Sequence, residues 1–204
     1  MEIEPQSDRE RLIGAARALL MEDGYDAVTF DAAAGRAGIP SAAAPAIFPT
    51  RDDLVLAALD AHWAELRPFL DQAFDRALPP LDRLRRFFDG VYAFQDAQWS
   101  KLGCVVGCLL LRVGSATSRM GERPRRRVAE RLEDLHRYVE GALKDAQEGG
   151  LIRSGDVRAM GWTLVHYVEG VLGMARIQND LHTLHGMMEQ SLEFLGARPS
   201  GLQT

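Results

Sequence analysis

Helical periodicity runs along almost the whole chain and is the feature that most restricts its fold. Apolar residues recur every three or four positions, as at Leu12, Ala15, Ala16 and Leu19, and this spacing places them on one face of a helix. No stretch shows the strict alternation of a half-buried strand, and proline and glycine fall at intervals that suit helix ends. The sequence therefore predicts an all-α protein of about nine helices.

Local end signals set the expected helix boundaries. A first helix is expected from Ser7 or Asp8 to the segment before Gly24, and a second begins after Thr29 and ends at Gly38. Thr50 is expected to cap a long fourth helix over residues 51–78. A fifth helix is expected to start at 79–80, and the later helices are expected at 103–115, 124–148, 156–179 and 181–195. In the fourth helix, Pro68 predicts a kink or an interruption.

Composition fits a soluble globular protein. The 204 residues are 47% hydrophobic, enough for one sizeable core or for a small domain attached to a larger one. No apolar run reaches the roughly 18 residues that a membrane span needs, and the acidic, polar N-terminus lacks the order of a signal peptide. We therefore expect a cytoplasmic protein with no membrane partner.

Two cysteines, Cys104 and Cys108, lie four residues apart in the predicted sixth helix. A bridge within one helix would be strained, so no structural disulfide is expected. Cys104 is expected at a helix N-terminus near Lys101, and both features lower the pKa of a thiol. Two interpretations stay open, namely two small buried residues or a reactive thiol sensor.

Charge is unevenly distributed along the chain. Residues 1–58 hold five basic and ten acidic side chains, a net charge of −5, and the remainder is neutral. An acidic N-terminal region weakens electrostatic attraction to nucleic acid.

The first part of the chain nevertheless carries a helix-turn-helix pattern. Three short helices are expected in about the first fifty residues, and "AGIP" (37–40) joins the second to the third. Over residues 9–60, "RERLIGAARALLMEDGYDAVTFDAAAGRAGIP…IFPTRDDLVLAAL" resembles the N-terminal region of the tetracycline-repressor-like (TetR) family. The matching positions are Ala16, "DGY" at 23–25, Thr29, Ala34, "AGI" at 37–39, Phe48, Thr50, Arg51, Asp52 and Leu54.

The resemblance implies an architecture and a function. It implies a helix-turn-helix head at residues 1–49, with the motif itself at about 29–48. A helical effector-binding and dimerisation domain follows at 50–197, with a flexible tail at 198–204. Such proteins are typically homodimeric transcriptional regulators, mostly repressors, that bind a DNA operator and a small-molecule effector. Neither catalysis nor a cofactor is implied.

The third helix departs from the family pattern. In the family it enters the DNA major groove, a cation where Arg51 stands contacts phosphate, and a residue at the position of Thr29 often meets the DNA backbone. Here Ala42, Ala43 and Ala46 can offer only methyl contacts to bases, and Pro45 stands where the family has an aromatic residue that usually meets phosphate. Pro45 predicts that this helix starts late or is distorted. The candidate DNA-contacting residues are Thr29, Arg36, Ser41, Ala42, Ala43, Pro45, Ala46 and Arg51. The alternative is a small-molecule-binding dimer whose head binds DNA weakly or not at all.

An effector would bind in the C-terminal helices, which are rich in aromatic residues and methionine. His166 is the strongest candidate for a polar contact, although a hydrogen-bonded core histidine explains it equally well. The histidines and cysteines show no metal-ligand spacing beyond His182 and His185, so no metal site is expected. The candidate ligand-binding residues are Trp63, Phe88, Tyr92, Trp99, Leu110, Trp162, His166, Tyr167 and Met174.

The last two helices are expected to form the dimer interface. Glycines on the eighth helix permit close approach, and an apolar stripe runs along the ninth. The candidate interface residues are Gly161, Gly170, Gly173, Leu184, Met188, Leu192 and Leu195. An arginine run at 123–131 alternates with acids, so we interpret it as a solvated helix start, with a supplementary DNA contact as the alternative.

Overall fold

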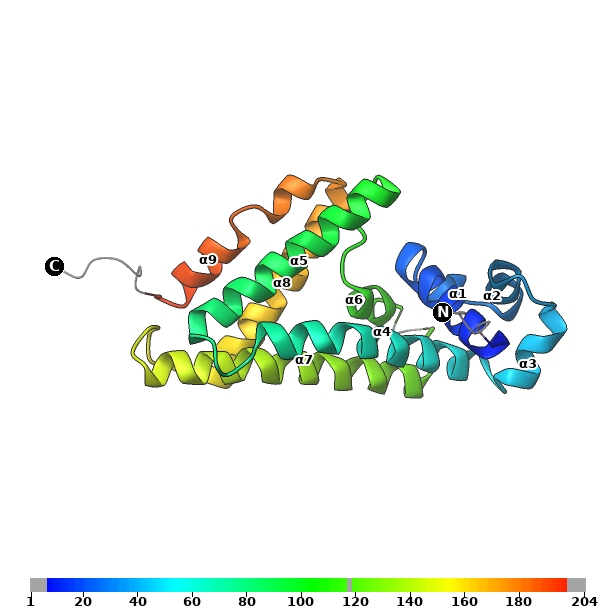
Figure 1. Ribbon diagram of the computed structural model, residues 1–204, viewed down its shortest axis with the longest axis horizontal. Coiled ribbons are helices and arrows are strands. Elements are labelled where there is room, and N and C mark those ends of the chain that lie inside the picture. The colour runs from blue at the N-terminus through cyan, green and yellow to red at the C-terminus, as the bar shows by residue number, and fades with distance from the viewer. Residues whose placement is uncertain (1–6, 117–118, 198–204) are drawn as a thin grey trace, which may run out of the picture. The chain divides into compact units, whose positions relative to one another are not determined.

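A computed structural model describes residues 7–116 and 119–197, and it contains two compact units (Figure 1). Unit 1 comprises Met1–Leu66 and Leu109–Leu132, and unit 2 comprises Arg67–Cys108 and Glu133–Thr204. The domain boundary predicted at 49/50 stays a prediction, and the tail predicted at 198–204 lies outside the described residues.

Every regular element in the described ranges is a helix, which confirms the all-α prediction. The α-helices are α1 (Asp8–Glu22), α2 (Phe30–Ala37), α3 (Ala44–Ile47), α4 (Arg51–Ala73), α5 (Pro80–Leu102), α6 (Leu109–Gly114), α7 (Glu122–Glu148), α8 (Val157–Gln178) and α9 (Met187–Phe194). Three 3₁₀ turns are η1 (Tyr25–Ala27), η2 (Ser41–Ala43) and η3 (Leu181–Leu184).

Capping chemistry sets the boundaries of the first helices, as predicted. Ser7 and Glu10 form a capping box at the start of α1. The hydroxyl of Thr29 accepts a hydrogen bond from the N–H of Ala32 at the start of α2. Gly38 ends α2 in the left-handed conformation at φ 66°, which a side chain would strain. Local interactions therefore set the ends of α1 and α2.

The core of unit 1 is built from small and aliphatic side chains. Leu12, Leu20, Val28 and Leu54 are fully buried, and Phe48 is 4% exposed at the end of α3. Burying an aliphatic or aromatic side chain of this size stabilises a fold by about 1.5–3 kcal/mol. Phe48 therefore anchors the short α3 segment to the rest of the head.

Three predicted helix boundaries were wrong. The segment 103–108 is not helical, because α5 ends at Gly103 and the next helix starts only at Leu109. The predicted ninth helix is split into η3 and α9 by Gly186, whose φ of 77° is incompatible with a continuous helix. Helix α4 ends at Ala73 rather than at residue 78, and it continues through Pro68 instead of stopping there.

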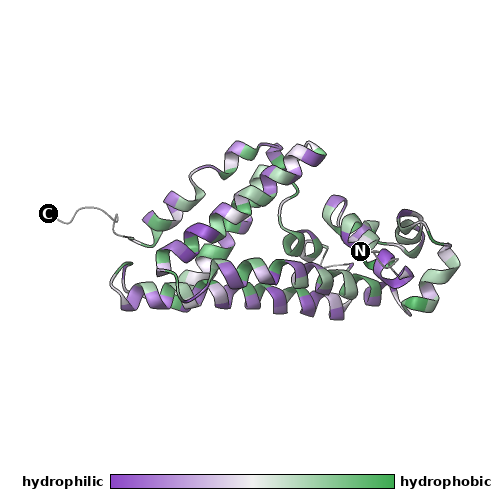
Figure 2. Cartoon of the chain, viewed as in Figure 1, coloured by the Kyte–Doolittle hydropathy of each residue, from purple (hydrophilic) through white to green (hydrophobic). Residues whose placement is uncertain are grey.

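In unit 2, α8 packs against η3 and α9, and its buried stripe carries Met160, Leu164, Val168 and Leu172. Figure 2 shows hydrophilic and hydrophobic residues alternating along α7, as expected for a helix with one buried stripe. None of the described helices is long and apolar enough to cross a membrane.

Candidate functional site

The recognition segment is short and irregular. A 3₁₀ turn covers Ser41–Ala43, and only the four residues Ala44–Ile47 form α3. Pro45 lies in the first turn of α3, where the missing N–H costs no helical hydrogen bond. The prediction that Pro45 delays the start of this helix is therefore confirmed.

This segment divides into a buried side and an exposed side. Ala44 is fully buried, whereas Ser41, Ala42, Pro45 and Ala46 are exposed. The exposed side therefore presents one hydroxyl, two methyl groups and a proline ring, with Ala43 half-buried beside them. Such a surface can contact thymine methyls but can offer few hydrogen bonds to base edges.

Arg51, expected at a DNA phosphate, is bonded inside the head. Its Nε donates to the carbonyl of Val28 at 2.6 Å, and its Nη2 donates to the carbonyl of Tyr25. The guanidinium carbon also lies 4.2 Å from the centre of the Tyr25 ring. To contact a DNA phosphate, the Arg51 guanidinium would have to give up its hydrogen bonds to the carbonyls of Val28 and Tyr25.

Arg36 is likewise engaged. Its guanidinium forms two hydrogen bonds to the carboxylate of Glu22, one of them 2.6 Å long. This bonding to Glu22 raises the pKa of Arg36 above its usual range. Arg36 is exposed, so the pair contributes little stability, but it cancels the charge that would face DNA.

The three other arginines of the head also have partners. Arg11 donates to the carbonyls of Ala37 and Gly38, at the C-terminus of α2. Arg17 pairs with the carboxylate of Glu65, and the guanidinium of Arg9 lies 5.4 Å from the centre of the Phe48 ring. All five basic side chains among residues 7–58 therefore contact other groups of unit 1.

Unit 2 contains a small cavity lined by residues of α5, α7 and α8. Its volume is about 10 Å³, which is close to the space that one water molecule needs. The lining residues are Phe87, Leu135, Val139, Leu164, Val165, Val168 and Glu169.

None of the nine predicted ligand-binding residues lines this cavity. Trp63 and Leu110 are buried in unit 1, and Phe88 is buried in unit 2. Trp99 is half-buried, and His166 and Met174 are exposed. Tyr92 bonds His185 at 3.2 Å, Tyr167 donates to Gln190 at 2.5 Å, and Trp162 stacks on His136. The larger predicted ligand set therefore stays a prediction.

Glu169 is the cavity residue that sequence reasoning missed. Its Oε2 is buried and has no hydrogen-bond partner among the described residues. Burial raises the pKa of Glu169, and a hydrogen bond from the Cys108 thiol partly offsets this effect. The signal in the sequence was a charged residue at helical spacing from Val165 and Leu172, inside an apolar stripe.

The cysteine prediction needs one correction. Both thiols are free, as expected, and each residue is half-buried. Cys104, however, follows the C-terminus of α5 rather than standing at a helix N-terminus as predicted. Cys108 bonds to Glu169, as described above, and its role as a sensor stays a prediction.

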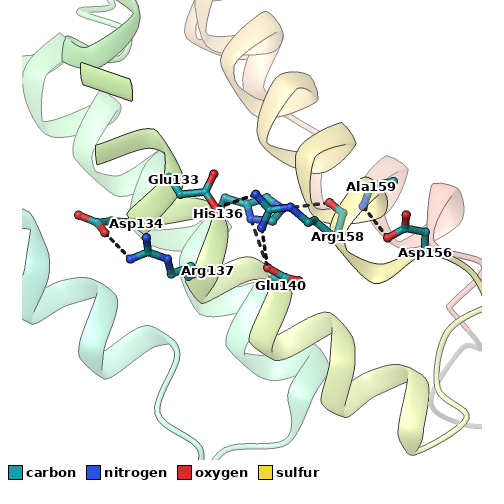
Figure 3. Close-up of polar contacts among 8 residues, drawn as sticks. All are labelled: Glu133, Asp134, His136, Arg137, Glu140, Asp156, Arg158 and Ala159. Carbon is teal, nitrogen blue, oxygen red and sulfur yellow. Dashed lines mark hydrogen bonds and ion pairs between the residues drawn. The ribbon is translucent and has the colours of Figure 1, made fainter. Parts of the chain in front are cut away.

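A polar cluster joins α7 to α8 (Figure 3). His136 is fully buried, and its Nε2 carries a proton because it donates to the carbonyl of Arg158 at 3.0 Å. Its Nδ1 lies 3.4 Å from Oε2 of Glu140 without hydrogen-bond geometry. Arg158 also pairs with Glu133 at 2.7 Å, and the ring of His136 stacks on Trp162 with centres 4.4 Å apart. These contacts fix the two helices of unit 2 against each other.

Some predicted interface residues are already covered within the protomer. Leu184 and Leu195 are buried, and a Cβ added at Gly161 would lie 2.8 Å from Nε2 of His136. Gly170 has open space around it, and Gly173, Met188 and Leu192 are half-buried. The dimer interface stays a prediction, and within the described residues no group of three potential metal ligands occurs.

Comparison with known families gives two matches. Residues 12–58 match the model described as "Bacterial regulatory proteins, tetR family", and residues 80–190 match "Tetracyclin repressor-like, C-terminal domain". A search of curated proteins found no significant match.

Solved structures show the same fold. The regulatory protein TetR from Rhodobacter sphaeroides is 26% identical, with 90% of this chain and 96% of that chain covered and a TM-score of 0.79. A TetR-family transcriptional regulator from Agrobacterium tumefaciens is 21% identical, with 95% and 100% covered and a TM-score of 0.83. The reduced form of NemR from E. coli is 18% identical, with the same coverage and a TM-score of 0.80.

Proposed function

Because the chain belongs to the TetR family of bacterial regulators, which are non-enzymatic, we propose that it is a ligand-responsive transcriptional repressor. It acts as a cytoplasmic homodimer and leaves its DNA operator when a small apolar or aromatic effector binds. The observation that carries this proposal is the exposed face of η2 and α3, in a head whose helix-turn-helix frame is intact. The small, mainly apolar cavity of unit 2 supports an effector site in the C-terminal domain.

Linkage between the two sites provides the regulation. Effector binding in unit 2 favours one conformation of the dimer, and half-site spacing on DNA favours another. Helices α4 and α7 each carry residues of both units, and α4 is the one that follows the helix-turn-helix directly. A typical coupling free energy of about 1–3 kcal/mol would lower operator affinity about 5- to 150-fold.

The test is a mobility-shift assay with DNA from upstream of the protein's own gene, at low salt. Ala46→Glu places a negative charge on the exposed face of α3 and should weaken binding strongly without destabilising the head, because Ala46 packs against nothing essential. Ala93→Glu, at an exposed position on α5 in unit 2, is the matched control. Equal binding by the two variants would show that this face does not contact DNA.

A second function is favoured by the contacts that all five arginines in residues 7–58 make within unit 1, four of them through hydrogen bonds or ion pairs. In this alternative the protein is a small-molecule-binding dimer whose head binds DNA weakly or not at all. Ala46→Lys distinguishes the two, because one added phosphate contact should steepen the salt dependence of DNA binding by about one ion. Absence of any shift for the wild type at low salt, with a ligand still binding, would favour the alternative.

A further inference from the structure

Glu169 is an unusual residue for the place that it occupies. It lies on α8 in the same stripe as Val165, Val168 and Leu172, all of which face the interior of unit 2. A carboxyl group loses its hydration there, and burial of an unpaired charge is costly. Natural cores rarely retain such a group without a partner.

The other residues of the cavity wall offer Glu169 no polar partner. α5 contributes Phe87, and α7 contributes Leu135 and Val139, so neither helix places a charged or titratable side chain in the cavity wall. The segment before α6 contributes the thiol of Cys108, a weak donor that bonds the carboxyl group. Oε2 is left without a hydrogen bond from any described residue.

We propose that Glu169 is the polar anchor of the effector site and that the effector is a lipophilic amine. Its cationic nitrogen would bond the carboxylate, and its apolar body would occupy the space between Phe87, Leu135 and Val165. The inference rests on the proposed function for the existence of an effector site, and it adds the chemical class of the ligand.

Two features of the site fit this ligand. The wall is apolar apart from one carboxyl group. A ligand with one cationic group and an apolar body would pair its charge with the carboxylate and contact the apolar side chains with the rest of its surface. The cavity of about 10 Å³ is too small for such a molecule, so binding must separate the surrounding helices. An effector that opens the helical core is the kind of ligand that shifts a conformational equilibrium.

The test uses three probes with the same apolar body, namely 4-phenylbutylamine, 4-phenylbutanol and 4-phenylbutyrate. Binding to the full chain is measured by isothermal titration calorimetry without DNA, so a failed mobility shift and a failed ligand test remain distinguishable. We expect the amine to bind at least about tenfold more tightly than the alcohol, and the carboxylate to bind most weakly. Glu169→Gln should abolish the preference for the amine and leave the alcohol unaffected, whereas Glu193→Gln, at an exposed position on α9, should change nothing.

The pH dependence gives a second readout. A cation binds the ionised carboxyl, so amine affinity should fall about tenfold per pH unit below the raised pKa of Glu169. Glu169→Gln should remove this dependence. Thermal melting tests the role of Glu169 in stability separately from ligand binding. Glu169→Leu removes a buried carboxyl group whose desolvation is costly, so its melting temperature should exceed that of the wild type.

Three outcomes of the binding measurements would overturn the proposal. They are absence of saturable binding of the amine to the wild type, equal binding of alcohol or carboxylate, and an amine preference that survives in Glu169→Gln. A fall in the melting temperature of Glu169→Leu would likewise contradict it, because it would assign Glu169 a structural role.

Discussion

Replacement of Arg51 by alanine should destabilise unit 1 whether or not DNA is present. The substitution leaves the carbonyls of Val28 and Tyr25 without their donor, and it removes the guanidinium from the Tyr25 ring. Hydrogen bonds to a charged group contribute about 1.5–3 kcal/mol each, and a cation–π contact adds about 0.5–1 kcal/mol. Since Arg51 is only half-buried, water recovers part of this loss, and we expect a net cost of about 2–4 kcal/mol.

Urea denaturation followed by circular dichroism measures this cost. With a slope of about 2–3 kcal/mol per molar urea, the midpoint should fall by about 1 M. Arg51→Lys keeps the charge but cannot bridge both carbonyls, so its midpoint should lie between those of wild type and Arg51→Ala. Arg125→Ala, at an exposed arginine on α7, is the control and should leave the midpoint unchanged. If Arg51→Ala matched the wild type in urea but lost DNA binding, Arg51 would be a phosphate contact and not a clamp on the head.

Three further predictions concern stability. Gly161→Ala places a Cβ 2.8 Å from Nε2 of the buried His136 and should lower the free energy of unfolding by about 1–3 kcal/mol. Thermal melting measures this loss, and an unchanged melting temperature would mean that the imidazole ring moves aside without cost. Burial lowers the pKa of His62 in the folded protein, so the unfolded chain binds a proton at this residue first as the pH falls. The free energy of unfolding should therefore decrease below about pH 6.5, and His62→Gln should reduce this pH dependence of stability. Arg83 is buried, donates to two backbone carbonyls and pairs with Asp145 at 2.5 Å. Asp145 is 40% exposed and stays hydrated without its partner, so Arg83→Met should cost about 1–3 kcal/mol in urea denaturation, mainly through the two carbonyls left without a donor. An unchanged midpoint would contradict a structural role.

Features set by neighbouring residues were the predictable part of this molecule. The cap at Thr29 and the left-handed conformation of Gly38 depend on residues within a few positions along the chain, so both can be predicted from the local sequence. The non-helical segment before Cys108 depends on distant groups instead, since Gln95 bonds both the N–H and the carbonyl of Gly107. No local pattern contains that pairing, so the apolar run around it resembled a buried helix.

The candidate site shows the same limit. Arg51 was recognised from its place in a motif, but its carbonyl partners are set by packing between the turn after α1 and the start of α4. Aromatic residues were chosen as ligand contacts because they are large and apolar, yet the cavity is lined mainly by aliphatic residues and one carboxylate. Which apolar residues border an empty space depends on how helices pack, and helix periodicity alone does not report it.

The recognition segment separates packing residues from exposed ones. Ala44 and Phe48 are buried in the head, whereas Ala42 and Ala46 are exposed, and this separation has a consequence for engineering. Residues that contribute nothing to stability can be randomised freely, because a folded scaffold survives almost any choice at those positions. A library at the exposed positions, selected against chosen operators, would therefore sample new sequence preferences without first having to recover a stable protein.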